Sequence, residues 1–166
     1  MLESQSQRKP WRRKALGFIA AAVTGLAMLL PSAPAAQAGV NWKLKSKQNG
    51  RCLTSWSEGL VFAFRCYDDE DQIWIERAND RRSNVATGFC LVGDNPIRTF
   101  TCGGWPDQRW FHEPLGNGLF RIKSRATGTC LDTAKEPNTV VGDYDVYLSP
   151  CNNSDDLGLK WEVVPA

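Results

Sequence analysis

Three side chains near the end of the chain are spaced so that they could together grip a ligand rich in hydroxyl groups. Asp132 lies two residues after Cys130, Tyr147 lies four residues before Cys151, and Asn152 directly follows that cysteine. A carboxylate can accept hydrogen bonds from neighbouring hydroxyls, a second polar group can fix the orientation of the ligand, and an aromatic ring can cover its C–H face. The sequence therefore predicts a shallow site for a polyhydroxylated ligand around Asp132.

Asp132 also has a structural interpretation, because an Asp after Gly-Thr-Cys-Leu can cap a turn through its side chain. Its combination with Tyr147 and Asn152 favours the binding site. Four further residues are second-rank candidates for contacts to such a ligand: Tyr144, Asp145, Phe64 and Asp71.

The candidate site belongs to the third of three copies of one sequence unit, in which Gly-x-Cys-Leu is followed by a second cysteine and then by Gln-x-Trp. The copies cover residues of about 41–78, 79–116 and 117–166. Where the third copy has Asp132, the first has Thr54 and the second has Val92, so we expect a site in the third copy. The tryptophans of the three Gln-x-Trp positions are Trp74, Trp110 and Trp161.

The local pattern predicts strands and turns. Apolar and polar residues alternate in 42–45 and in 119–123, as they do in half-buried strands, and Gly and Asn mark a turn at 116–118. No segment of 39–166 has the spacing of a long helix. Because three short all-strand copies cannot each bury an apolar face, we expect an all-β fold in which they pack around a shared pseudo-threefold axis.

Residues 1–38 are typical of a signal peptide: a basic leader, an apolar run over 15–30 and the small-residue end Ala36-Gln37-Ala38. The apolar run is shorter than the roughly 18 residues expected of a membrane-spanning helix, although a retained anchor is the alternative. We therefore predict cleavage after Ala38 and a secreted domain over 39–166, with no membrane contact after cleavage. The pair Arg12-Arg13 is a weak indication of twin-arginine export.

Charge and cysteine content narrow the classes of function. The leader holds five of the 20 basic residues and one of the 18 acidic residues, which leaves 15 basic and 17 acidic residues and no basic stripe for nucleic acid. Six cysteines in an exported chain predict three disulfides. We predict no metal site, no cofactor and no enzyme activity, because the chain has no Cys-x-x-Cys pair and its one histidine, His112, stands beside no nucleophile.

The three units resemble the ricin B-type β-trefoil lectin family over essentially the whole of 39–166. The resemblance implies a β-trefoil with the three Gln-x-Trp tryptophans in its core. It also implies one disulfide in each repeat, namely Cys52–Cys66, Cys90–Cys102 and Cys130–Cys151. The third repeat is further similar to actinohivin-like bacterial lectins, which implies that Asp132, Tyr147 and Asn152 bind sugar.

The resemblance implies a non-catalytic carbohydrate-binding domain whose partner is a polysaccharide or glycan, with mannose and galactose as candidate sugars. It leaves the oligomeric state open. The third repeat departs from the family at Gly158 and Leu159, and its loop between Cys130 and Cys151 is enlarged. The alternative function is a protein-binding trefoil, such as a protease inhibitor, that uses this loop.

Aromatic residues outside the Gln-x-Trp positions receive two interpretations. We expect Phe64 and Phe100 to be buried strand residues, and the second repeat to be structural. Trp56 and Trp105 fall in predicted loops, where an exposed ring could contact sugar or protein.

Overall fold

The computed structural model describes residues 41–57, 59–139 and 142–166, which all belong to one compact unit. The predicted signal peptide, residues 1–38, lies outside the described residues. The described chain is built from strands, and its helices are two three-residue 3-10 turns, η1 (Glu70–Gln72) and η2 (Pro106–Gln108). No helix in these ranges is long and apolar enough to cross a membrane. The predicted all-β class is confirmed.

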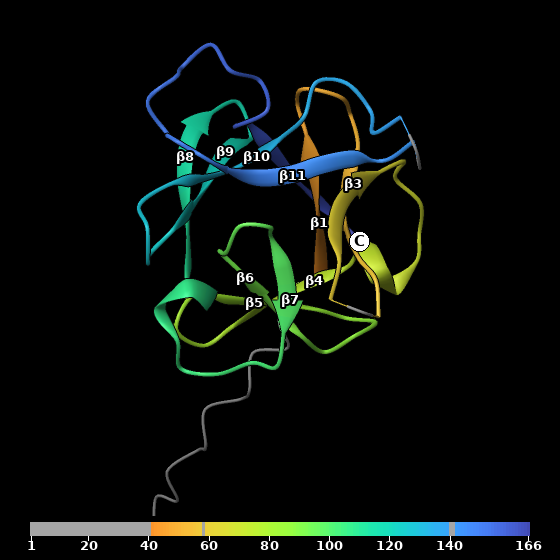
Figure 1. The fold of residues 1–166 in the computed structure, drawn as a ribbon, viewed down its shortest axis with the longest axis vertical. Coiled ribbons are helices and arrows are strands. Elements are labelled where there is room, and N and C mark those ends of the chain that lie inside the picture. Colours follow the sequence, from red (N-terminus) through yellow and green to blue (C-terminus); the bar gives the residue numbers. More distant parts are fainter. Residues whose placement is uncertain (1–40, 58, 140–141) are drawn as a thin grey trace, which may run out of the picture. The chain divides into compact units, whose positions relative to one another are not determined.

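Six antiparallel strands form a closed ring around the core, two from each repeat (Figure 1). The first strand pairs with the last, so the two ends of the domain are joined. The two ring strands of the second repeat are joined by an isolated antiparallel bridge from Arg81 to Arg109, which completes the ring. The six strands are β1 (Asn41–Ser46), β4 (Trp74–Arg77), β5 (Arg81–Asn84), β8 (Trp110–Gly116), β9 (Leu119–Ser124) and β12 (Trp161–Pro165).

Each repeat adds one antiparallel strand pair to this ring. The pairs are β2 (Cys52–Ser55) with β3 (Val61–Phe64), β6 (Cys90–Val92) with β7 (Arg98–Phe100), and β10 (Cys130–Thr133) with β11 (Tyr144–Ser149). Four strands per repeat, three times over, is the β-trefoil architecture. The strands predicted from alternation, β1 and β9, are present, and Asn117 makes the turn between β8 and β9 with a positive φ of 52°.

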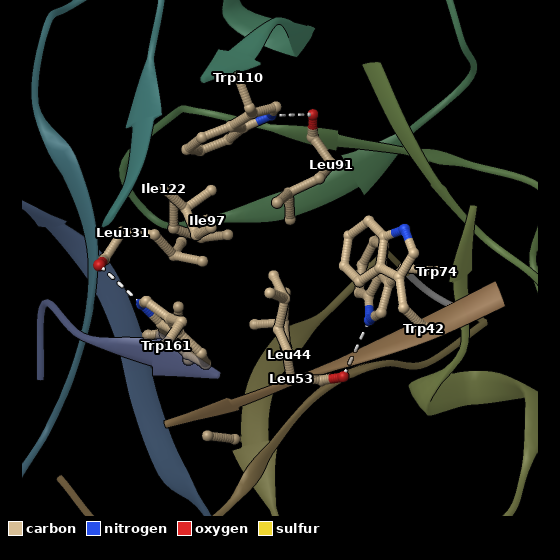
Figure 2. Close-up of a cluster of buried hydrophobic side chains, with 12 residues drawn as sticks. Trp42, Leu44, Leu53, Trp74, Leu91, Ile97, Trp110, Ile122, Leu131 and Trp161 are labelled. Carbon is tan, nitrogen blue, oxygen red and sulfur yellow. Dashed lines mark hydrogen bonds between the residues drawn. The ribbon is translucent and has the colours of Figure 1, made fainter. Parts of the chain in front are cut away.

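The three Gln-x-Trp tryptophans meet in the core, as predicted. Trp74, Trp110 and Trp161 are each 0% exposed. Each indole N–H donates a hydrogen bond of 3.0 Å to the carbonyl of the leucine after the first cysteine of its own repeat (Figure 2). The buried indole nitrogens are thus satisfied, and the same contact repeats around the pseudo-threefold axis.

The glutamine of Gln-x-Trp anchors the loop after the second cysteine. Gln108 donates through Nε2 to the carbonyl of Thr101 at 2.8 Å and accepts from the backbone N–H of Gly103 at 2.7 Å. Gln72 makes the matching pair of bonds in the first repeat. In the third repeat the buried Leu159 occupies this position and has no amide, so the loop there is held by other contacts.

All six cysteines form disulfides in the pairing that the family resemblance implies, Cys52–Cys66, Cys90–Cys102 and Cys130–Cys151. Each disulfide joins the first residue of β2, β6 or β10 to a cysteine two residues beyond the end of the strand that pairs with it. The covalent links therefore close each strand pair on itself rather than connecting one repeat to another.

Candidate functional site

Strand register brings the predicted site residues of the third repeat together. Asp132 on β10 lies directly opposite Tyr147 on β11. Tyr147 is 38% exposed, and Asn152 is exposed in the turn that follows β11. At the matching positions of the other two repeats, Thr54 faces Phe62 and Val92 faces Arg98. Neither of these pairs places a carboxylate opposite a tyrosine.

Asp132 is a buried carboxylate with one oxygen engaged and one without a partner. The residue is 2% exposed, and its Oδ2 accepts a hydrogen bond of 2.6 Å from the hydroxyl of Ser149. Its Oδ1 is buried and accepts no hydrogen bond. Burial raises the pKa of Asp132 and the nearby carboxylate of Asp156 adds to the rise, whereas the Ser149 hydrogen bond opposes it.

Gly158 makes room for this carboxylate. A Cβ at position 158 would collide with Oδ1 of Asp132 and would lie 2.6 Å from the carbonyl oxygen of Thr133. The residue before Gln-x-Trp in the other repeats is Asp71 or Asp107. The third repeat thus carries its acid on strand β10 instead, and the glycine that departs from the family pattern is the residue that allows this.

The Tyr147 hydroxyl is affected by the charges of two carboxylates, those of Asp132 and Asp156. The pKa of Tyr147 is raised by partial burial and by the charges of Asp132 and Asp156. Asp156 is also tied to the wall of the site, because it accepts a 2.9 Å hydrogen bond from the backbone N–H of Gly158. Sequence reasoning missed Asp156 and Ser149. The signal for Ser149 was its place two residues before the second cysteine, where the other repeats have Phe64 and Phe100.

The second-rank residues of β11 lie on different faces of the strand. Tyr144 packs against the core, and the Arg51 guanidinium lies 5.5 Å from its ring centre. Asp145 is exposed and pairs across to Phe62 on β3, two residues from Tyr147 and therefore on the same side of β11. Tyr144 is a packing residue, whereas Asp145 stands at the edge of the site.

The loop between Cys130 and Cys151 carries the alternative protein-binding prediction. Residues 140 and 141 of this loop lie outside the described residues. No observation on its remaining residues tests the prediction.

The second-rank residues of the first repeat are connected through Tyr67. Phe64 is half-buried and meets the Tyr67 ring edge-on at 6.2 Å, and the Tyr67 hydroxyl donates to Oδ2 of Asp71 at 2.7 Å. Burial, this hydrogen bond and the charges of Asp71 and Asp69 raise the pKa of Tyr67 to about 12. Oδ1 of Asp71 is buried and unpaired, as it is in Asp132.

The second repeat has an open pocket of about 280 Å³. Phe100 is 47% exposed rather than buried, because β7 turns this residue outward, and the exposed Trp105 lies 6.3 Å away between ring centres. Arg98 and Asp107 also line the pocket, and Oδ1 of Asp107 is buried and unpaired. The expectation that Phe100 is buried was wrong, whereas the expected exposure of Trp105 is confirmed.

The guanidinium of Arg98 is already engaged at the edge of this pocket. It lies 5.3 Å from the centre of the Phe100 ring and pairs with Asp94 at 2.8 Å. The pocket therefore offers two rings, a hydrogen-bond donor and an acceptor, without a free cationic centre.

Comparison with solved structures gives the same fold, and no curated protein matches the chain. The designed three-fold symmetric protein ThreeFoil superposes with a TM-score of 0.66 at 18% identity, covering 76% of this chain and 99% of its own. The Haemophilus ducreyi cytolethal distending toxin gives 0.65 at 22% identity, with 82% and 87% covered. The β-trefoil lectin of the Vibrio vulnificus hemolysin/cytolysin, with N-acetyl-D-lactosamine bound, gives 0.58 at 21% identity, with 77% and 96% covered. At these identities the likeness shows the fold alone.

Sequence comparison supplies the family. Residues 40–161 match the ricin-type beta-trefoil lectin domain, a match that spans most of the chain and all three repeats. Together with the trefoil strand order and the tryptophan core, this match shows that the chain belongs to the ricin-type β-trefoil lectin domain family.

Proposed function

We propose that this chain is a secreted, non-catalytic carbohydrate-binding protein with a sugar site in its third repeat, formed by Asp132, Tyr147 and Asn152. Carbohydrate binding follows from membership of a lectin domain family. The observation that supports this site best is the buried Oδ1 of Asp132, which accepts no hydrogen bond although the residue is almost fully enclosed.

A sugar hydroxyl would satisfy this oxygen. A buried carboxylate oxygen without a donor is unfavourable by about 1–3 kcal/mol, so a ligand that supplies the donor gains this free energy on binding. The Ser149 hydroxyl holds Oδ2, which leaves Oδ1 for the ligand. The exposed Tyr147 ring then covers the C–H face of the sugar, and the Asn152 amide fixes its orientation.

The test compares Asp132 with an exposed carboxylate outside the site. Asp132→Asn keeps the volume of the side chain and removes its charge, and we expect it to weaken glycan binding by about tenfold or more. Glu113→Gln, at an exposed position of β8, is the control and should leave binding unchanged. A glycan array of mannose- and galactose-containing ligands on the oxidised protein selects the ligand, and calorimetry measures its affinity. Equal affinities of Asp132→Asn and the unchanged protein would refute the site.

The open pocket of the second repeat is a second candidate site for the same function. Its exposed Phe100 and Trp105 rings give a sugar a stacking surface, and the unpaired Oδ1 of Asp107 offers an acceptor in place of the one that Val92 lacks. Two weak sites on one chain raise the avidity for a polymeric glycan beyond that of either site. Trp105→Ala should then lower binding to a polysaccharide while leaving the Asp132-dependent binding of a monosaccharide intact.

A further inference from the structure

A pocket of about 390 Å³ lies at the junction of the first and second repeats. One wall is the end of β2 and the residues after it, and the other is η1 with the turn that precedes β6. Its lining residues are Ser55, Trp56, Ser57, Asp71, Ala86 and Thr87.

The walls of this pocket are held in place by hydrogen bonds and ring packing. Asn84 donates from its amide to the carbonyl of Asp71 at 2.7 Å, and the backbone N–H of Ala86 donates to Glu70 at 3.2 Å, which joins the turn to η1. Across the pocket, Trp56 meets the ring of Phe62 edge-on at 4.7 Å. The pocket is therefore preorganised, which lowers the entropy cost of binding.

The corresponding junction between the third and first repeats is bridged by a side chain. There the Asn49 amide donates to the Thr133 hydroxyl at 2.6 Å and to the carbonyl of Ala134 at 3.1 Å. At the position that matches Asn49, Thr87 instead directs its hydroxyl to Asn84, within its own turn, at 3.4 Å. The junction of repeats one and two thus lacks this bridge, and the pocket is present there.

The lining combines an exposed ring with a carboxylate. Trp56 is 52% exposed, and Oδ1 of Asp71 is buried without a partner while Oδ2 accepts from Tyr67. Asp71 is the one ionisable side chain among the lining residues, and Asp69 and Glu70 precede it. The surroundings are negative, so they disfavour an anionic ligand and favour a cationic one.

We infer that this pocket binds an amino-sugar residue with a free amine, whose C–H face stacks on Trp56 and whose ammonium group pairs with the carboxylate of Asp71. A single aromatic ring does not form the several-ring cage that selects quaternary ammonium groups. Hydroxyl-bearing Ser57 and Thr87 suit a ligand that also carries hydroxyls. The inference rests on the proposed carbohydrate-binding function but not on the site in the third repeat.

The test uses glucosamine oligomers and N-acetylglucosamine oligomers of equal length, titrated into the full oxidised protein by calorimetry. The two ligands share a ring and differ in whether the nitrogen is charged. We expect the glucosamine oligomer to bind about tenfold more tightly. Asp71→Asn and Trp56→Ala should each remove about this tenfold. Phe111→Ala, which changes an exposed ring outside the pocket, should leave glucosamine binding unchanged.

The outcomes separate this pocket from the third-repeat site. Asp132→Asn should leave the glucosamine affinity unchanged, and it should do so even if that site binds no neutral glycan. Equal affinity for both oligomers, or full affinity in both Asp71→Asn and Trp56→Ala, would overturn the inference. Trp56→Ala leaves the hydrogen bond from Tyr67 to Asp71 in place, so it decides the question if Asp71→Asn weakens this bond and fails to fold.

Discussion

Gly158 lies directly against the carboxylate of Asp132, so that a side chain at position 158 and the observed carboxylate cannot occupy the same space. The pair explains how the third repeat differs from the others, which carry Asp71 or Asp107 where Gly158 stands. The observed position of the Asp132 carboxylate leaves no room for a side chain at position 158, so the two positions are sterically coupled.

Replacing Gly158 tests this relationship. Gly158→Ala should displace the Asp132 side chain and destabilise the protein by about 1–3 kcal/mol, the usual effect of overpacking a buried position. Thermal unfolding measures the loss. The double variant Asp132→Val with Gly158→Ala, which copies the small apolar residue of the second repeat, should recover only the part of the loss that is due to the carboxylate, because the new Cβ still lies 2.6 Å from the carbonyl oxygen of Thr133. An unchanged melting temperature in Gly158→Ala alone would contradict the steric relationship.

The Gln108 side chain makes hydrogen bonds to the loop around Cys102. Leu159 stands at the matching position of the third repeat and has no group that could make them. Gln108→Leu should destabilise the protein by about 2 kcal/mol, because the Gly103 N–H and the Thr101 carbonyl lose their partner. Urea denaturation gives this value. In contrast, Leu159→Ala removes apolar contacts without freeing a hydrogen-bonding group, and its loss should reflect the cavity alone, at about 2–5 kcal/mol. Faster amide exchange at Gly103 should accompany the first substitution and be absent from the second.

His112 makes stability depend on pH. Its Nε2 accepts a 3.0 Å hydrogen bond from the buried guanidinium of Arg82, which requires a neutral ring. Burial and the Arg82 charge lower the pKa of His112 from 6.5 to about 4. Because the unfolded chain takes up a proton that the folded chain does not, stability should be full above about pH 6.5 and fall by about 3 kcal/mol as the pH drops towards 4.

The chain has one histidine, so a single variant isolates this effect. His112→Asn keeps an acceptor for Arg82 and has no ring to titrate. The difference in the free energy of unfolding between pH 7 and pH 4.5, measured with urea, should be smaller in the variant by most of this amount. The same pH dependence in both proteins would show that another group is responsible.

The Cys130–Cys151 disulfide closes the longest of the three covalent loops, with a separation of 21 residues against 12 for Cys90–Cys102. Replacing both cysteines of either pair by alanine should cost about 3 kcal/mol through the greater entropy of the unfolded chain, with the larger loss for the longer loop. Chemical denaturation of the two double variants compares them directly. A reversed order would point to packing of the cysteines rather than to chain entropy.

The repeat pattern in the sequence predicted an all-β fold around a pseudo-threefold axis. The family resemblance implied the β-trefoil, with Trp74, Trp110 and Trp161 in its core, and the structure confirms both. The disulfide pairing followed from the family resemblance and is present in the structure.

The surface features were harder to predict, because they depend on contacts between residues far apart in sequence. Phe100 was expected to be buried, although strand alternation alone does not tell which face of a short strand is covered. Gly158 looked like a departure from the family until its contact with Asp132 was visible. The pocket of Trp56 and Asp71 joins residues on opposite sides of a repeat junction, which no local pattern reveals.

The pairing of β1 with β12 has a consequence for engineering. The backbone N–H of Ala166 donates to the carbonyl of Asn41 at 3.3 Å, so the two ends of the folded domain are neighbours. A short linker could join them, and the chain could be reopened at the exposed turn around Asn117 without breaking a strand. The order in which the three repeats are translated would then differ while their arrangement around the axis stayed the same, which makes this domain a candidate for circular permutation and for insertion into another protein.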